Sequence, residues 1–223
     1  MDISWTTIIV VILLIIIGYF IWRTVSSSSS NSTGTTKLNT ATTLKTLTPT
    51  TSFTFSTWIA IDNWGGGGNN IIKTIETTPD FSLTLGTNTN DLILKIGTIA
   101  KPGTNTTISN IVPLQTWASI IVSVNNGNSA DIYVNGKLVR TVALTNAYNL
   151  TAGSVTVGGS TSGSTGYIST TFDKNSIGPQ EAWNIYSSGY GSGNGNGVSD
   201  FFNKYKLRFA FVKDNVELSR LDI

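Results

Sequence analysis

Apolar and polar residues alternate along much of the chain. In SFTFSTWIAI, residues 52–61, the side chains of Phe53, Phe55, Ile59 and Ile61 fall on one face at a period of two. This period predicts a β-strand with one buried face. Further short apolar runs follow at about eight-to-twelve-residue intervals with turn residues between them, which is typical of a sandwich or jelly roll. The later predicted strands are 71–76, 81–85, 92–96, 106–112, 117–124, 131–134, 137–142, 154–157, 167–172, 205–212 and 216–221.

The stretch 117–142 is the part around which we expect the other strands to fold. Asn135-Gly136 alone separates its last two β-rich runs, and this dipeptide favours the positive φ angles of a type I′ turn. The turn predicts a tight antiparallel hairpin. Strict alternation on the second strand would place Leu138 and Val142 on one face and Val139 on the other.

One helix interrupts the predicted strands. In the run 177–186 a proline, Pro179, lies near the expected start and Glu181 follows in the first turn, as helix N-termini prefer. Ala182, Ile185 and Tyr186 would share one face of this helix, which we interpret as a structural plug on the sandwich.

The first segment is uncharged and strongly apolar from residue 5 to residue 22. As a helix it would be roughly 27 Å long, close to the thickness of a bilayer core. Trp5 at one end, Tyr19 and Trp22 at the other, and the adjoining Arg23 match the residues that anchor spans at membrane interfaces. We therefore predict a membrane anchor at 1–25. A cleaved signal peptide is the alternative, but Asp2 is acidic and no small-residue cleavage site precedes the serines.

The orientation of this anchor depends on few charges. Arg23, Lys37 and Lys45 follow the span, so the positive-inside rule favours a cytoplasmic C-terminal domain. Three glycosylation sequons, which would suit a luminal domain, begin at Asn31, Asn105 and Asn149. In a chain rich in Asn, Ser and Thr such triplets arise by chance, and we give them little weight.

Residues 26–51 are rich in Ser and Thr and contain few large apolar side chains. Such a composition predicts a flexible tether, and the globular domain would then occupy 52–223. Alternatively, extended threonine-rich segments can be captured as added strands along the edge of a sheet. In the domain itself the hairpin 205–221 is expected to close the sandwich.

Two motifs carry a resemblance to a known family. A tryptophan opens a strand at residue 117 and DIYVNGK follows at 131–137, while a short Glu-Ala-x-x-Ile-Tyr helix lies at 181–186. Together these resemble the laminin-G-like branch of the concanavalin A-like jelly rolls. The resemblance implies an all-β, antiparallel two-sheet sandwich with one short helix, here preceded by a single transmembrane helix. It says little about activity, because this fold carries lectins, glycosidases, adhesion modules and structural proteins.

Composition excludes several kinds of chemistry. The chain has no His and no Cys, which removes the commonest general base, the thiol nucleophile and most zinc ligand sets. A glycosidase would still need two carboxyls that project together from a strand, and no predicted strand carries such a pair. We therefore predict a protein that is not an enzyme and uses no cofactor or metal. The net charge of +2 without a basic run gives no reason to expect nucleic acid as a partner.

Carbohydrate binding is the main alternative among binding functions. Lectins of this fold stack sugars on exposed aromatic rings and orient them with nearby polar groups. Trp64 beside Asp62, and Tyr190 in the glycine-rich loop, are the candidate residues. We assign the other large rings of the globular part to its core: Trp58, Trp117 and Trp183.

The order of segments resembles proteins of large icosahedral DNA viruses. These combine an N-terminal span, a Ser/Thr-rich tether and a laminin-G-like domain ending in a Gly/Asn-rich loop and a strand of the type FNKYK, here 202–206. The implied function is that of a minor capsid component linking a shell to an internal membrane, with the bilayer and other capsid proteins as partners. The alternative is a membrane-anchored lectin or adhesin with glycans as partners.

Overall fold

The structure is a computed structural model and describes residues 18–19, 31–45, 47–65, 69–74, 81–97, 103–150, 153–159, 164–190, 208–213 and 216–222. By its internal contacts the chain divides into two units. One unit is 30–193, and the other combines 1–29 with 194–223.

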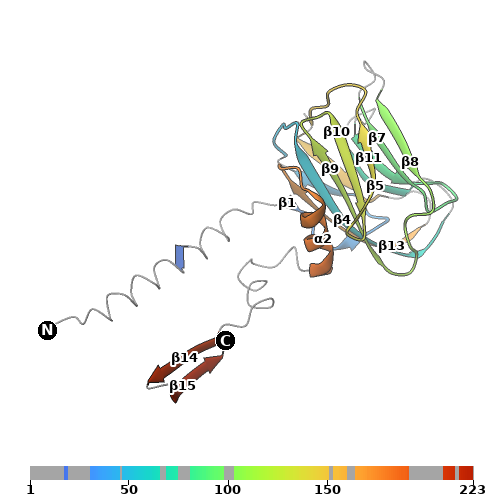
Figure 1. Ribbon diagram of the computed structural model, residues 1–223. Coiled ribbons are helices and arrows are strands. Elements are labelled where there is room, and N and C mark those ends of the chain that lie inside the picture. Colours follow the sequence, from blue (N-terminus) through green and yellow to red (C-terminus); the bar gives the residue numbers. More distant parts are fainter. Residues whose placement is uncertain are drawn as a thin grey trace. The chain divides into compact units, whose positions relative to one another are not determined.

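The unit 30–193 is a sandwich of two antiparallel sheets (Figure 1). The larger sheet has the order β1-β13-β4-β9-β10-β11, with β2 also paired to β13. Its strands are β1 (Asn31–Ser32), β2 (Thr36–Lys37), β4 (Phe53–Asn63), β9 (Trp117–Asn125), β10 (Ser129–Val134), β11 (Lys137–Ala143) and β13 (Thr165–Asp173).

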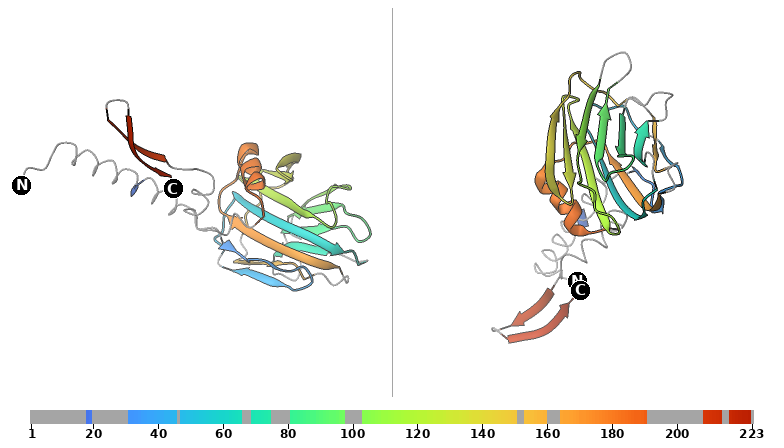
Figure 2. Two further views of the ribbon diagram at one scale, coloured as in Figure 1. Left: turned by 90° about the horizontal axis from the view of Figure 1, so that it is seen from below. Right: turned by 90° about the vertical axis from the view of Figure 1, so that its right-hand side faces the viewer.

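The smaller sheet has the order β3-β12-β5-β6-β7-β8. Its strands are β3 (Thr42–Lys45), β5 (Asn69–Thr74), β6 (Phe81–Leu85), β7 (Leu92–Ile96), β8 (Thr104–Ile108) and β12 (Ser154–Val157). Figure 2 shows the two sheets as layers. The prediction of an all-β sandwich with one short helix is therefore confirmed.

The main core lies between the sheets and is organised by aromatic rings. Phe53 and Phe55 on β4 point inward, and Phe55 contacts Phe81 of β6 with ring centroids 5.2 Å apart. Phe172 of β13 packs 5.1 Å from Phe55 on the other side. The four residues that the period-two pattern assigned to the buried face of β4 are all at most 1% exposed: Phe53, Phe55, Ile59 and Ile61.

The helix α2 (Pro179–Ser188) packs on the outer face of the larger sheet. Its Ala182 is buried with Ile121 of β9 and Tyr133 of β10, whose side chains point away from the main core. The helix begins with Pro179 directly after an extended Gly178 and ends at Gly189, whose φ is 84°. The predicted helix and its role as a plug are confirmed.

The hairpin of β10 and β11 has the expected turn and an unexpected bulge. Asn135 and Gly136 have φ angles of 49° and 74°, as a type I′ turn requires. The pairing shifts between Ile132 and Tyr133, so strict alternation fails on β11. As a result Val139 and Val142 both pack against the main core. The prediction that they point to opposite faces is wrong, because a bulge inserts one extra residue.

The N-terminal boundary of the domain also differs from the prediction. Residues 31–45 form β1 and β2 at the edge of the larger sheet and β3 at the edge of the smaller one. Leu38 and Leu44 are buried in the main core, and this burial repays the ordering of a threonine-rich segment. The prediction of a flexible tether at 26–51 is thus wrong for residues 31–45. The alternative prediction, in which this segment adds strands to the edge of a sheet, describes them.

The C-terminal hairpin consists of β14 (Arg208–Lys213) and β15 (Val216–Asp222). These two strands are paired with each other, and the closing of the sandwich by this hairpin stays a prediction.

The predicted anchor lies almost wholly outside the described residues, including Trp5, Trp22 and Arg23. Tyr19 is described, has helical backbone and is 53% exposed. Within the described part of the chain, no helix has both the length and the apolar character needed to cross a bilayer.

We expect Gly136→Ala to lower the free energy of unfolding by about 1–3 kcal/mol, because the residue has a positive φ and sits against α2. A Cβ there would lie 2.9 Å from ring carbon Cε3 of Trp183 and 2.9 Å from Cβ of Tyr186. Chemical denaturation measures the change. Gly153→Ala is the matched control, since a Cβ at Gly153 has no atom within 4 Å. Equal stability of the two variants would contradict the packing of the turn on α2.

Candidate functional site

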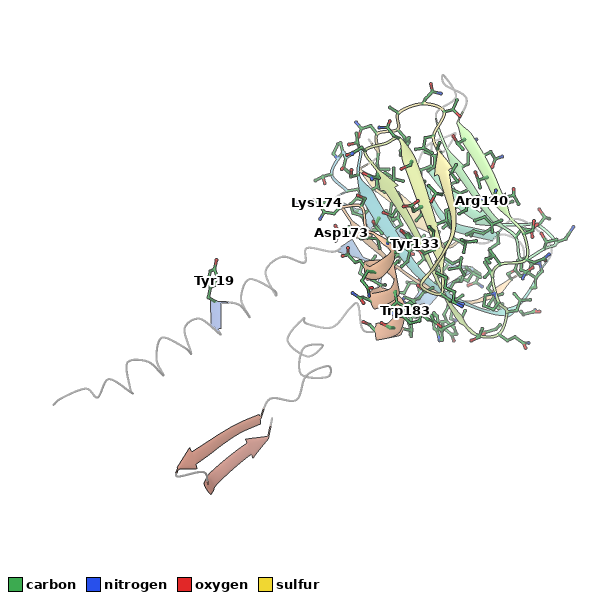
Figure 3. The ribbon with its side chains drawn as sticks, in the orientation of Figure 1. Tyr19, Tyr133, Arg140, Asp173, Lys174 and Trp183 are labelled. Carbon is green, nitrogen blue, oxygen red and sulfur yellow. The ribbon has the colours of Figure 1, made fainter. Side chains whose placement is uncertain are left out.

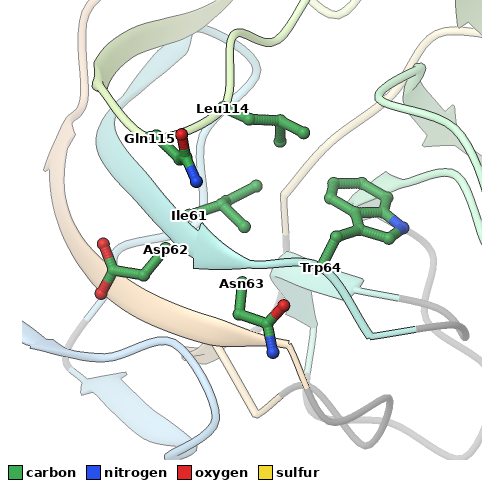
Figure 4. A pocket seen from close by; sticks show the side chains of 6 residues that line it. All are labelled: Ile61, Asp62, Asn63, Trp64, Leu114 and Gln115. Carbon is green, nitrogen blue, oxygen red and sulfur yellow. The ribbon is translucent and has the colours of Figure 1, made fainter.

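A pocket lies where β4 ends, at one rim of the sandwich (Figure 4). Its volume is about 290 Å³. The lining comes from the end of β4 and the residue that follows it, together with the loop that precedes β9. The six lining residues are Ile61, Asp62, Asn63, Trp64, Leu114 and Gln115.

Hydrogen bonds of the backbone, to a carbonyl oxygen and to a buried hydroxyl, fix the residues on both sides of the pocket. The N–H of Gln115 donates to the carbonyl oxygen of Ile61 at 2.9 Å, which holds the loop before β9 against the end of β4. On the other side, the N–H of Gly65 donates to Oγ of the fully buried Ser164 at 2.9 Å. The same hydroxyl donates back to the carbonyl oxygen of Gly65 at 3.2 Å. The hydrogen bonds of Gly65 therefore fix the backbone directly after Trp64.

The pocket combines one aromatic ring with several uncharged polar groups. Trp64 is partly buried against the main core, and its Nε1 has no hydrogen-bond partner among the described residues. Leu114 faces the indole ring, whereas the carboxylate of Asp62 points away from it on the other side of the strand (Figure 4). No Lys or Arg is among the lining residues. Such a lining suits a neutral ligand that has both an apolar face and hydroxyl groups.

Tyr190, the third predicted carbohydrate-binding residue, does not join this pocket. It stacks on Trp117 of β9 with ring centroids 3.7 Å apart and an interplanar angle of 14°. It also meets Trp58 of β4 edge to face at 6.2 Å. The structure thus brings Asp62 and Trp64 together and places Tyr190 on the outer face of the larger sheet.

Three tryptophans that we assigned to the core lie on this outer face instead. Trp58 and Trp117 are half-buried, and Trp183 of α2 is 44% exposed (Figure 3). The period of two carried the signal for Trp58, since residues at odd positions of β4 point inward. We call the five stacked residues here the aromatic face: Trp58, Trp117, Trp183, Tyr186 and Tyr190.

Buried hydroxyl groups lie between the larger sheet and α2. Ser123 of β9 accepts a hydrogen bond from the N–H of Ile177 at 2.8 Å and donates to the carbonyl oxygen of the same residue at 3.2 Å. By contrast, the hydroxyl of the fully buried Tyr133 makes no hydrogen bond of normal geometry to the described residues. Burial, and next the negative charge of Asp131 and a weak hydrogen bond to its carboxylate, raise the pKa of Tyr133 above its ordinary value.

The described residues contain no group of three or more acidic side chains that could hold a metal ion. At the end of β13, Oδ1 of Asp173 accepts hydrogen bonds from the backbone N–H and the side-chain Nδ2 of Asn175, at 2.8 and 3.0 Å. This arrangement is a local turn that satisfies the carboxylate.

Sequence comparison decides the family. The Laminin_G_3 model, described as the concanavalin A-like lectin/glucanases superfamily, matches residues 31–178, more than half of the chain. The chain belongs to this superfamily. The match of the concanavalin A-like domain begins at β1, in agreement with a sandwich that starts at Asn31. A search of curated proteins found no match.

Solved structures similar to this concanavalin A-like domain include three binding domains of botulinum neurotoxins. The serotype G binding domain has a TM-score of 0.56 and 14% identity, over 70% of this chain and 43% of that one. The serotype D ligand binding domain, in complex with N-acetylneuraminic acid, has a TM-score of 0.57 and 12% identity, over 70% of this chain and 42% of that one. The serotype DC binding domain, in complex with rat synaptotagmin II, has a TM-score of 0.51 and 18% identity, over 61% of this chain and 36% of that one. This chain spans less than half of each, and identities this low show the fold alone.

We expect Tyr133→Phe to raise the free energy of unfolding by about 1 kcal/mol at neutral pH, because it removes a buried hydroxyl that makes no hydrogen bond of normal geometry. Because the pKa of Tyr133 is raised in the folded state, the unfolded chain loses this proton first, and the wild type loses stability as the pH rises above about 10. The variant should lack this contribution. Denaturation at pH 7 and pH 10.5 measures both effects, with the exposed Tyr167→Phe as control. Destabilisation by Tyr133→Phe would show that the hydroxyl has a partner.

Proposed function

We propose that this concanavalin A-like domain is a non-catalytic carbohydrate-binding module and that the pocket beside Trp64 is its binding site. The observation that carries the proposal is an indole ring placed in a pocket whose other polar groups are mainly side-chain amides. A sugar presents a patch of C–H groups on one face and hydroxyl groups around its edge. This pocket offers a matching partner to each.

The proposed contacts follow from the types of residue in the lining. The indole of Trp64 would stack on the apolar face of the sugar. The amides of Asn63 and Gln115 each offer both donors and an acceptor, so either can bind a hydroxyl group in either direction. Because the lining has no cation, we propose a neutral sugar rather than an acidic one.

Two further considerations support binding without catalysis. Glycoside hydrolysis normally needs two carboxyl groups flanking the scissile bond, and Asp62 supplies the one carboxylate of the lining. The superfamily includes lectins by its own description, and one similar structure is a ligand binding domain in complex with a sugar. Both facts concern relatives, and they make the proposal reasonable for this chain.

A second proposal concerns the role that the sequence suggested first. A minor capsid component would transmit force between a shell and an internal membrane, with the domain facing the shell. One observation favours such a link: β1, β2 and β3 attach residues 31–45 along the edges of both sheets. A pull from the N-terminal side would therefore act on strands paired within the sandwich.

We expect Trp64→Ala to weaken binding of a neutral glycan by about tenfold, since an aromatic stacking contact contributes about 1 kcal/mol or more. A glycan array identifies the sugar, and isothermal titration then measures its affinity. Trp64→Phe should retain part of the affinity, and Gln115→Ala should lower it. Leu138→Ala, which alters an exposed apolar residue of β11, is the matched control. A glycan that binds Trp64→Ala as tightly as wild type would place the site elsewhere, and a sialylated glycan bound in preference would contradict the neutral class.

For the second proposal, we expect the full chain to co-purify with a capsid shell after detergent has removed the lipid. Sedimentation of the shell fraction followed by immunodetection measures the association. Loss of the chain together with the lipid would contradict this role and would leave the glycan proposal unaffected.

A further inference from the structure

The aromatic face is a second surface, separate from the pocket. We propose that the aromatic face lies in the headgroup region of the lipid bilayer into which residues 5–22 are predicted to insert. This inference depends on that predicted span and is independent of the proposed glycan pocket.

The aromatic face exposes rings that the fold does not need for its core. Trp183 is 44% exposed and Tyr190 is 36% exposed. Tyr167 of β13 is 45% exposed. It pairs with Ala60, and Ala60 pairs with Trp117. Because paired residues point to the same side of a sheet, Tyr167 lies on the same side as the aromatic face. Tryptophan and tyrosine combine an apolar body with a polar tip, and they are enriched at the headgroup level of membranes for that reason.

The chain enters and leaves the sandwich beside the aromatic face. The hydroxyl of Thr35, just after β1, is in hydrogen-bond contact with the hydroxyl of Tyr190. Residues 24–30 alone separate β1 from Arg23 at the end of the predicted span, and even fully extended they reach no farther than roughly 30 Å. An inserted span would therefore hold the start of β1 within this distance of Arg23.

The charges near the aromatic face fit a zwitterionic surface. Lys37 of β2 pairs with Tyr167 and is exposed, so it can reach a lipid phosphate. Glu181 on α2 is exposed as well and would oppose binding to a strongly anionic surface. Phosphatidylcholine-type headgroups are therefore the ligand assigned to the aromatic face. A glycan on the aromatic face is the rival occupant, and the experiment separates the two.

The experiment uses the absence of cysteine from the chain. In the full-length protein, Ser187→Cys introduces a single labelling site on the exposed side of α2, one turn after Trp183. Thr107→Cys, exposed on β8 of the smaller sheet, is the matched control. Each variant is labelled with a fluorophore and reconstituted into phosphatidylcholine vesicles that contain a lipid with a nitroxide on its headgroup.

We expect quenching at position 187 to exceed quenching at position 107 by about threefold or more, because aromatic anchoring holds α2 at the headgroup level. Adding Trp183→Ala to Ser187→Cys should reduce this difference. Adding Leu114→Ala, which removes a similarly exposed apolar side chain at the pocket, should leave it unchanged.

Three results would overturn the inference. The first is equal quenching at positions 187 and 107. The second is failure of the full chain to float with the vesicles. The third is protection of the label at 187 by a soluble glycan that competes with the lipid, which would assign the aromatic face to sugar. Loss of glycan binding in Trp64→Ala bears only on the pocket, so the two proposals fail separately.

Discussion

The structure depends on the burial of one face of β4 between the two sheets. Phe53, Phe55, Ile59 and Ile61 use the inward positions of this strand, and Phe55 joins the larger sheet to the smaller one through Phe81. Because successive residues of a strand point to opposite sides, the burial of these four side chains also determines which residues of β4 lie on the outer face. Trp58 must point away from the core, and Trp64 follows directly after the end of β4. The core, the pocket and the aromatic face thus follow from the register of one strand.

Most of the sandwich could be predicted because its strands are long enough to show their period. The N-terminal strands could not be predicted in the same way, since β1 and β2 have two residues each and a threonine-rich sequence shows no alternation. Their order comes from tertiary context, through pairing with β13 and the burial of Leu38 and Leu44. The bulge at Val139 is a similar case, because it depends on the partner strand and on α2.

The candidate site was predictable only as far as it is contiguous in sequence. Asp62 and Trp64 lie two residues apart just after the predicted strand 52–61, and an aromatic ring beside polar groups suggests a ligand. Gln115 comes from a distant loop and reaches the pocket through its backbone hydrogen bond to Ile61, a contact that no local pattern indicates. The sequence indicates that the ring of Tyr190 is exposed. Its packing against Trp117 and Trp58 depends on where α2 directs the chain, which no local pattern indicates.

The placement of α2 depends on hydrogen bonds as well as on apolar burial. Its own small core contains Ile121, Tyr133, Ile177 and Ala182, far fewer side chains than the main core. The hydroxyl of Ser123 binds both the N–H and the carbonyl of Ile177, while that of Thr54 donates to the carbonyl of Asn175 at 2.8 Å. These bonds satisfy the backbone where it crosses the sheet without secondary structure. They therefore set the direction in which the chain enters α2, and with it the stacking of the aromatic rings on the outer face.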